Sequence, residues 1–600
     1  MSGMKKLLKY LKDYKKETVL APLFKLLEAF FELLVPLAVA GIIDRGIEGG
    51  DKGYIGLMGG CMVALAVIGL VAAVTAQFFA AKAAVGFSTK LRQAMFDYIQ
   101  GLEFESIDKA GTSTMITRMT SDINQVQNGV NMVLRLFLRS PIVVFGAMIM
   151  AFTIDVKSAL VFVVAIPVLA IVVMGITAYT IPLYKKVQAA LDKVLSTTRE
   201  NLTGVRVIRA FHRESLEKEQ FHEENIHLVN LQQFVGKISA CMNPATYIIV
   251  NVATIVLIYT GAIQVNVGNL SQGEVVAILN YMSQILVELV KLANLVITIT
   301  KALACADRVA AVFELQPQGA SGQGADVNVA QTVSGKVAES GKMSAVAGIP
   351  FLEFDHVSLT YKGAGAETLQ DIHFTVNKGD TVGVIGGTGS GKSSVVNLIP
   401  GFYQATEGAV RLEGRDLKEI PAEELRGRIG VVPQKAVLFK GTIRSNLLWG
   451  KSDATDEELW QAIDLAQARE VVEGKDGKLD AKIAQNGRNL SGGQRQRLTI
   501  ARALVRRPEI LILDDSASAL DYATDAKLRT AIKSLDGNTT TFIVSQRASS
   551  IRHADKIVVL DDGELAGVGT HDELLAGCEV YQEIYYSQYP EEKSQKVKQA

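Results

Sequence analysis

The chain has 600 residues, of which 48% are hydrophobic and only 13 are proline, so two or more domains are expected and a disordered or fibrous chain is excluded. Its 62 basic and 62 acidic side chains cancel, which argues against a general nucleic-acid-binding protein. The four cysteines are too scattered for a zinc site or a disulfide framework. The halves nevertheless differ: residues 1–300 hold 27 Lys and Arg against 22 Asp and Glu, whereas residues 301–600 hold 35 against 40.

The first half contains apolar stretches long enough to cross a membrane. About 20 helical residues span the roughly 30 Å of hydrocarbon in a bilayer. Soluble helices rarely continue that far without a polar face. We therefore expect six spans, at about residues 18–42, 56–80, 130–154, 158–183, 244–265 and 273–300.

The N-terminal segment also resembles a secretory signal. Six lysines between Lys5 and Lys16 precede an apolar stretch, and Ala38-Val39-Ala40 mimics a cleavage site. The stretch is too long for a signal sequence, however, and it contains Glu28 and Glu32. We interpret it as an uncleaved first span that follows a short amphipathic helix at the membrane surface.

Basic residues are distributed unequally among the connections between spans. Residues 82–129 and 184–243 are long and rich in Lys and Arg, whereas the other three connections are short and nearly free of them. The positive-inside rule predicts that both termini lie in the cytosol. The two long segments keep a helical pattern, so we expect the spans to continue beyond the membrane as helices.

Residues 316–349 mark a change in composition. They are dominated by Gly, Ser, Ala, Gln and Val and contain no aromatic residue, which indicates a linker. We expect a membrane domain over residues 1–315, this linker, a soluble α/β domain over residues 350–590 and a polar tail over residues 591–600. The soluble domain opens with a strand pattern from Phe351 to Val357.

A phosphate-binding motif follows the next predicted strand, Thr381 to Ile385. The motif and the residue after it are Gly386, Gly387, Thr388, Gly389, Ser390, Gly391, Lys392, Ser393 and Ser394. Its glycines let backbone N–H groups surround phosphate oxygens, and the following helix adds positive potential. We expect Lys392 to reach the β- and γ-phosphates of ATP and Ser393 to ligate Mg²⁺.

A second apolar strand, Ile510 to Leu513, ends in two acidic residues. Asp514 stands where a carboxylate is needed to hold Mg²⁺, and Asp515 is placed to polarise a water molecule. An ordinary strand end is the alternative interpretation. The phosphate loop in the same domain makes that alternative the weaker one.

Further motifs carry a family resemblance. Leu490-Ser491-Gly492-Gly493-Gln494 resembles the signature motif of ATP-binding cassette (ABC) transporters. The resemblance implies that Tyr361 stacks on adenine, that Gln434 of the Q-loop serves catalysis and Mg²⁺, and that Ser518 and Asp521 form the D-loop. Residues 200–211 resemble the second cytoplasmic connection of ABC exporters, so the likeness covers nearly the whole chain.

The resemblance implies a fold and an assembly. The fold is the six-span helical membrane bundle of ABC exporters, followed by an α/β ABC ATPase domain. Two such halves pair and enclose two ATP molecules. Ser491, Gly492, Gly493 and Gln494 of one half then complete the ATP site of the other half.

Two positions depart from the family pattern. Asp515 and Gln546 stand where the family has a catalytic Glu and a switch His. Because the other ATP-binding residues are intact, these changes favour a site that binds ATP and hydrolyses it poorly. We expect the degenerate-site subunit of a heterodimeric bacterial multidrug-type exporter, whose partner supplies the Glu and His. A slow homodimer is the alternative.

Charged residues inside the predicted spans admit two interpretations. Lys25, Glu28 and Glu32 share one face of the first span, and Glu288 and Lys291 lie three residues apart in the sixth. The three carboxylates either line a partly acidic cavity for amphipathic or cationic substrates, or they form Lys–Glu pairs that stabilise the bundle. We favour the pairs.

The sequence thus predicts ATP-driven export of amphipathic molecules, such as drugs or lipids, by a multi-pass protein of the cell membrane in contact with lipid. A peptide exporter is less favoured, because no protease-like domain precedes the first span. An ATP-gated regulator that does not pump is a further alternative. Residues near 105–115 and 208–216 are expected to contact nucleotide-binding domains.

Overall fold

The computed structural model describes residues 2–315, 349–516, 520–533 and 539–592. The chain divides into two compact units: Met1–Leu102 with Ala110–Pro317, and Glu103–Lys109 with Gln318–Ala600. The expected linker, apart from Ile349, lies outside the described residues, as do Ser518 and the tail beyond residue 592.

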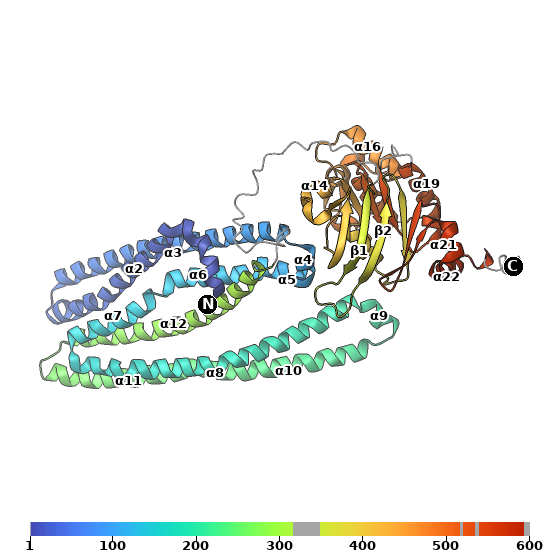
Figure 1. Ribbon diagram of the computed structural model, residues 1–600. Coiled ribbons are helices and arrows are strands. Elements are labelled where there is room, and N and C mark those ends of the chain that lie inside the picture. The colour runs from blue at the N-terminus through green and yellow to red at the C-terminus, as the bar shows by residue number, and fades with distance from the viewer. Residues whose placement is uncertain (1, 316–348, 517–519, 534–538, 593–600) are drawn as a thin grey trace. The chain divides into compact units, whose positions relative to one another are not determined.

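The first unit is built from long helices (Figure 1). Among the described residues, six helical stretches are long and apolar enough to cross a membrane, which agrees with the expected number of spans: Gly3–Glu48, Lys52–Gln100, Thr112–Ile154, Val156–Thr203, Glu214–Asn266 and Gln272–Val312. At 1.5 Å per residue, stretches of 41 to 53 residues extend roughly 60–80 Å, about twice the hydrocarbon thickness. The helical stretches are therefore long enough to continue beyond the membrane.

The regular helices of this unit pack closely where their side chains are small. They are α1 (Ser2–Leu7), α2 (Lys15–Gly41), α3 (Lys52–Gln100), α5 (Thr112–Thr117), α6 (Ile123–Leu136), α7 (Arg139–Ile154), α8 (Val156–Thr203), α9 (Val205–Ala210), α10 (Glu214–Ala240), α11 (Met242–Asn266) and α12 (Gln272–Val312). A Cβ atom on Gly129 of α6 would lie only 2.3 Å from the Cβ of Ala302 on α12. Such close approach gives membrane helices their van der Waals contact.

The second unit contains two main sheets. One is antiparallel, in the order β2 (Leu369–Val376), β1 (Leu352–Leu359), β4 (Glu407–Leu412), β5 (Arg415–Asp416). The other has the order β12 (Glu564–Gly569), β11 (Lys556–Asp561), β3 (Thr381–Gly386), β10 (Thr540–Val544), β9 (Ile510–Asp514), β6 (Ile429–Val432). Only β12 runs antiparallel to its neighbour in the second sheet. A short pair, β7 (Gly441–Thr442) and β8 (Lys482–Ile483), stands apart.

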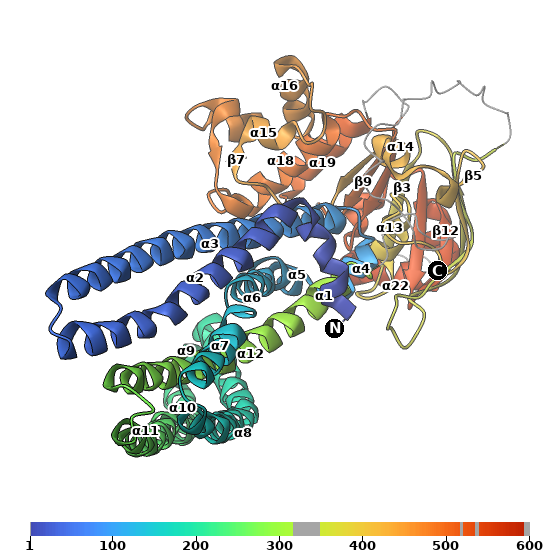
Figure 2. The same ribbon diagram turned by 90° about the vertical axis from the view of Figure 1, so that its left-hand side faces the viewer.

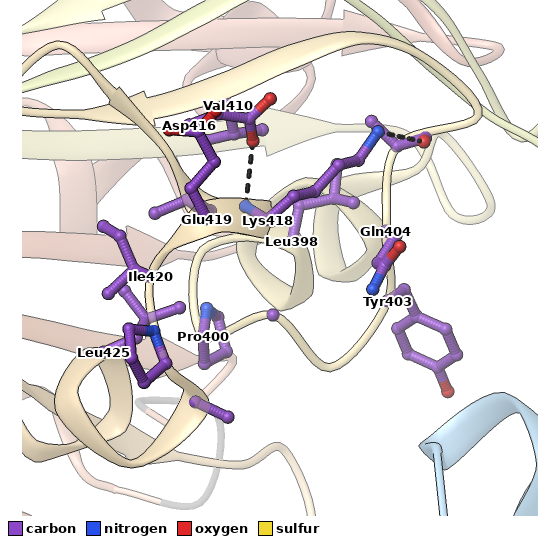
Figure 3. Close-up of a pocket in the computed structure, with 15 residues that line it drawn as sticks. Leu398, Pro400, Tyr403, Gln404, Val410, Asp416, Lys418, Glu419, Ile420 and Leu425 are labelled. Carbon is purple, nitrogen blue, oxygen red and sulfur yellow. Dashed lines mark hydrogen bonds between the residues drawn. The ribbon is translucent and has the colours of Figure 1, made fainter. Parts of the chain in front are cut away.

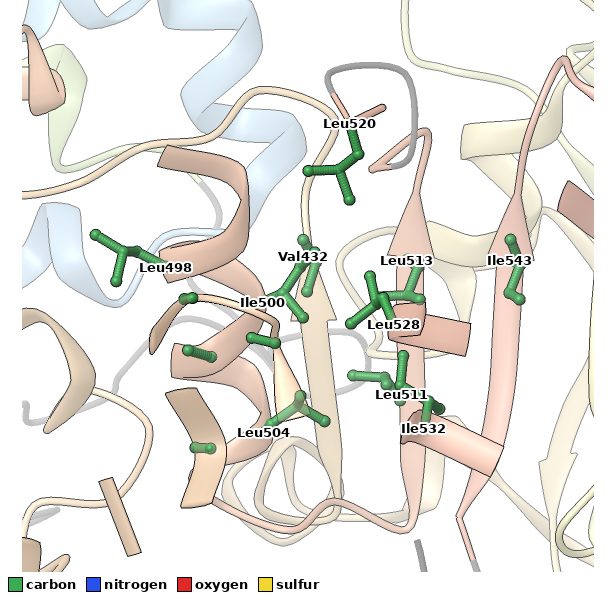
Figure 4. Close-up of a cluster of buried hydrophobic side chains, with 14 of the residues drawn as sticks. Val432, Leu498, Ile500, Leu504, Leu511, Leu513, Leu520, Leu528, Ile532 and Ile543 are labelled. Carbon is green, nitrogen blue, oxygen red and sulfur yellow. The ribbon is translucent and has the colours of Figure 1, made fainter. Parts of the chain in front are cut away.

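Helices and strands of this unit share buried apolar clusters. The helices are α4 (Phe104–Ala110), α13 (Lys392–Leu398), α14 (Ala422–Gly427), α15 (Ile443–Leu447), α16 (Asp456–Leu465), α17 (Arg469–Glu473), α18 (Gly492–Leu504), α19 (Tyr522–Lys533), α20 (Ala548–Ile551), α21 (His571–Gly577) and α22 (Glu579–Gln588). Figure 4 shows Leu504 of α18 and Leu528 of α19 beside the strand residues Val432, Leu513 and Ile543. This packing holds the carboxyl ends of β6, β9 and β10 at one edge of the sheet.

Candidate functional site

The phosphate loop connects β3 to α13, as the sequence predicts. Gly389 and Gly391 have φ angles of +88° and +89°, which side chains other than glycine rarely adopt. A Cβ atom on Gly386 would lie 2.2 Å from the carbonyl oxygen of Leu560 and 2.4 Å from Ser390 Oγ. The loop therefore depends on glycine both for its turn and for its close packing. Thr388 is exposed at its tip.

Lys392 is buried at the start of α13 and lies under the loop. Its Nζ donates hydrogen bonds to the carbonyl oxygens of Gly386, at 3.0 Å, and Gly387. Burial lowers the pKa of Lys392, although the carboxylates of Asp515 and Asp514 oppose this shift. The ammonium group is thus held among acceptors, beside two acidic groups.

Ser393 and Asp514 meet although they are 121 residues apart in the sequence. Ser393 Oγ donates a hydrogen bond of 3.0 Å to Asp514 Oδ1. Burial raises the pKa of Asp514, the hydrogen bond from Ser393 lowers it, and Asp515 raises it further. The structure therefore brings together two of the three groups assigned to Mg²⁺ from the sequence, and hard oxygen ligands of this kind suit that ion.

Asp515 and Gln546 follow neighbouring parallel strands. Asp514 at the end of β9 is in register with Val544 at the end of β10. The backbone N–H of Asp515 donates a 3.0 Å hydrogen bond to the carbonyl oxygen of Val544, and Asp515 has a φ of +44°. Gln546 is exposed, and its main-chain carbonyl oxygen accepts a hydrogen bond from Gln588 Nε2 at 2.8 Å.

Tyr361, which the family resemblance assigns to adenine, lies beside α13. Its hydroxyl oxygen is 3.0 Å from Ser394 Oγ, and its ring contacts that of Tyr403 edge-on at 5.0 Å. Gln434 is exposed two residues after β6, at the same edge of the sheet as Asp514. Asp521 accepts two hydrogen bonds from Thr524 and so caps α19.

The signature residues form the N-terminus of α18. Ser491 Oγ accepts a hydrogen bond from the N–H of Gln494 at 3.3 Å, and Gln494 Oε1 accepts one from the N–H of Ser491 at 3.0 Å. This reciprocal cap starts the helix immediately after Ser491, leaving Gly492 and Gly493 in its first turn. In Figure 2, α18 lies with α15 and α16, whereas α13 lies beside β3 and β9.

Residues 103–109 belong to the nucleotide-binding unit, although they connect α3 and α5 of the first unit. The ring of Phe104 packs on that of Phe402, with centroids 4.5 Å apart. Tyr403 donates a 2.6 Å hydrogen bond to Asp108, and Lys362 pairs with Glu105 at 3.2 Å. Residues 105–109, the first part of the predicted contact segment 105–115, thus pack on the nucleotide-binding unit through aromatic and ionic contacts.

A pocket of about 320 Å³ lies near this attachment and outside the phosphate loop (Figure 3). Leu398, Pro400 and Tyr403 line one part of it. Lys418 donates hydrogen bonds to Asp416 through its backbone N–H and to the Ala405 carbonyl through Nζ. Residues 386–393 do not line this pocket.

The three carboxylates that the sequence analysis placed in the spans all lie near one residue that it missed, Arg139. Arg139 of α7 pairs with Glu288 at 2.5 Å and with Glu32 at 2.6 Å, and it lies 3.8 Å from Glu28. Lys25 pairs with Glu28 at 2.5 Å, and Lys291 with Glu288 at 2.8 Å. All three predicted cavity carboxylates are therefore ion-paired. The missed signal was an arginine inside the third predicted span.

Comparisons with known proteins agree with this geometry. Residues 18–289 match the family described as ABC transporter transmembrane region, and residues 369–518 match the family described as ABC transporter. The chain is 35% identical over 592 residues to the ABC transporter ATP-binding protein YfiB of Bacillus subtilis (strain 168), covering 99% of this chain and 100% of that protein. It is 31% identical over 599 residues to YgaD of the same organism, whose name provisionally assigns it to multidrug export, with 98% and 99% covered.

A solved structure of a bacterial Atm1-family ABC exporter with ATP bound has the same fold. The TM-score is 0.77 at 23% sequence identity, and the match covers 96% of this chain and 98% of that one. The chain therefore belongs to the ABC transporter family, as a multi-pass membrane protein in which the six described helical stretches that can cross a membrane precede an ABC-type ATPase domain.

Proposed function

We propose that this chain is the low-turnover half of a heterodimeric ABC exporter that moves amphipathic molecules, such as drugs or lipids, out of the cell. The observation that carries the proposal is the pair Asp515 and Gln546 beside otherwise complete ATP-binding residues. We place the ATPase domain and both termini in the cytosol, because basic residues concentrate in the two long connections.

ATP binding is supported by the local fit of the phosphate loop. Lys392 donates to two carbonyl oxygens, and the phosphate oxygens of ATP are stronger acceptors for the same ammonium group. Ser393, Asp514 and Gln434 would hold Mg²⁺, which neutralises charge on the phosphates when bound. Tyr361 offers its ring to adenine.

Slow hydrolysis is supported by the reach of Asp515. Aspartate is one methylene shorter than glutamate, which withdraws the carboxylate by about 1–1.5 Å, and misplacement on this scale costs on the order of a hundredfold in rate. The hydrogen bond between the Asp515 N–H and Val544 ties down the main chain that would have to advance. Gln546 can still donate a hydrogen bond to a phosphate oxygen, but it does not titrate as histidine does.

A second half-transporter is needed to complete each ATP site. The different places of α18 and α13 in the unit support the proposal that Ser491, Gly492, Gly493 and Gln494 serve the phosphates held by the partner (Figure 2). We propose a partner chain that carries the catalytic Glu and the switch His. The working site would then combine the partner's phosphate loop with this chain's signature.

Coupling between ATP and transport is supported by residues 103–109. Their aromatic and ionic contacts make them part of the ATPase unit, so movement of that unit carries the ends of α3 and α5 with it. ATP binding would favour one of two membrane-domain states, and hydrolysis would return the other. We expect residues 208–216 to make the corresponding contact with the partner.

The membrane charges support an amphipathic rather than a specifically cationic substrate. Lys25, Arg139 and Lys291 balance Glu28, Glu32 and Glu288, so this network has no net charge. A pocket of about 350 Å³ between α2 and α12 presents Glu32, Gln284 and Lys291 beside Val35, Pro36 and Val287. This mixture of apolar and polar groups suits a molecule that has both kinds of surface.

Transport into inside-out vesicles tests the export function. Vesicles containing this chain and the partner should accumulate an amphipathic dye against its gradient when ATP is added. Vesicles carrying Lys392→Ala in this chain and the equivalent change in the partner provide the control. Equilibration of the dye without accumulation would contradict export and would indicate an ATP-gated regulator.

A further inference from the structure

An exposed cluster lies on the antiparallel sheet, outside the nucleotide site. His356 of β1 and the β2 residues Asp371 and His373 each offer one ligand atom, and these atoms lie within 4.8 Å of one another. All three residues are exposed, and none belongs to the phosphate loop, the signature or the residues that follow β9 and β10. We infer that this cluster binds a divalent transition-metal ion of the zinc class.

Two irregularities in strand pairing bring the side chains together. Phe354 pairs with Phe374 and Val357 with Ile372, so two residues of β1 face the single residue His373. A second register shift lies between the pairs Val357–Ile372 and Leu359–Leu369. His356 and Asp371 have φ angles of +49° and +48° at these shifts. Bulges redirect side chains, and here they turn His356 towards Asp371 and His373.

The resulting geometry is close to that of a metal site. His356 Nδ1 lies 2.5 Å from Asp371 Oδ1, and the two imidazole rings are stacked with centroids 5.3 Å apart. Ligands that bind one tetrahedral zinc ion at about 2.0–2.2 Å lie roughly 3.3–3.6 Å apart, so small side-chain rotations that separate His356 Nδ1 from Asp371 Oδ1 and adjust His373 would complete the site. Exposed side chains make such rotations readily.

The ligand set selects the class of metal. Two imidazoles and one carboxylate suit Zn²⁺, Co²⁺ and Ni²⁺, whereas Mg²⁺ and Ca²⁺ prefer oxygen ligands alone. The nearby cation Arg411 is engaged by Asp355 at 2.7 Å and Glu353 at 3.5 Å, so its charge is offset. Three protein ligands also leave room for water on the ion.

A bound ion would fasten β1 to β2 at their irregular pairing. The fastened segment ends at Leu359, two residues before Tyr361. An ion that binds only the folded sheet stabilises the folded protein. The inference rests on the local geometry alone and is independent of the proposed export function.

Metal titration of the full chain tests the inference. Tag-free, metal-stripped protein in detergent, with excess Mg²⁺ and at mildly alkaline pH, is titrated with Zn²⁺ against a chromophoric chelator. We expect one site in the parent protein and its loss in the double variant H356A/H373A. D371N should weaken binding by on the order of tenfold or more, because a charged ligand is lost. H553A removes another exposed histidine and should leave binding unchanged.

A second readout separates binding at the cluster from binding elsewhere. Co²⁺ should give visible absorption bands in the parent protein and in H553A, and these bands should disappear in H356A/H373A. Zn²⁺ should raise the thermal unfolding midpoint of the parent but not of the double variant. A double variant that keeps the stoichiometry and affinity of the parent would overturn the inference. So would a parent protein with no zinc site.

Discussion

At Asp515 the main chain limits how far the carboxylate can reach. Its φ of +44° and its hydrogen bond to Val544 fix the residue after β9, so reach must come from the side chain. We expect D515E/Q546H, which restores the longer carboxylate and an imidazole, to raise the ATPase rate of this site by up to about a hundredfold. The rate is measured with this chain purified together with its partner, and adding K392A should abolish the gain. An unchanged rate in D515E/Q546H would show that reach is not limiting.

The ionised Asp514 carboxylate lowers the stability of the folded chain because it is buried. Burial raises its pKa, so its ionisation in the folded state opposes folding once the pH exceeds the pKa of the unfolded chain. Without nucleotide or Mg²⁺, we therefore expect D514N to raise the unfolding midpoint of the full chain at pH 7. The gain should shrink as the pH falls towards about 3, where aspartate is largely protonated in either state.

Asp521 provides a matched control for this sign. Hydrogen bonds from Thr524 lower the pKa of Asp521, so its ionisation favours folding at neutral pH. D521N should therefore lower the midpoint at pH 7 where D514N raises it. Stabilisation by Mg²⁺-ATP should weaken in D514N. A midpoint that falls in both variants would contradict the burial argument.

Among the helices, α7 is tied to α2 and α12 through Arg139. Both Arg139 and Glu288 are buried, so removing the guanidinium leaves a carboxylate without its main partner. We expect R139M to lower the free energy of unfolding by about 3–5 kcal/mol, which is measured as a large fall in the unfolding midpoint in detergent. K291M removes a cation from the same carboxylate, but the Lys291 side chain is 42% exposed and the change should cost much less. Equal losses of stability in R139M and K291M would show that burial of the removed cation does not determine the loss.

Helix α22 holds the segment after β10. Gln588 Nε2 donates to the carbonyl oxygen of Gln546, and Gln588 Oε1 accepts from the N–H of Ala548 at 2.9 Å. Because Q588A removes these bonds, we expect it to lower the free energy of unfolding by about 1 kcal/mol and to speed amide hydrogen exchange over residues 545–551. E583A changes an exposed residue of the same helix and should not alter that exchange. Unchanged exchange in Q588A would contradict the argument that Gln588 stabilises the segment after β10.

Over the whole molecule, the sequence predicts what local patterns encode. The six spans follow from uninterrupted apolar stretches, and the phosphate loop follows from residues that are contiguous in the chain. The membrane network could not be predicted in this way, because Arg139 is 149 residues from Glu288 and 107 from Glu32. The bulges that gather His356, Asp371 and His373 depend on strand register, which no short motif records.

The most direct test compares the two ATP sites of the assembled pair. ATPase activity is measured for this chain with its partner, for D515N in this chain, and for the partner with its catalytic Glu changed to Gln. We predict that the partner's change abolishes turnover while D515N leaves most of it. Loss of turnover in D515N as complete as that in the partner's variant would contradict the account, as would full activity of this chain alone.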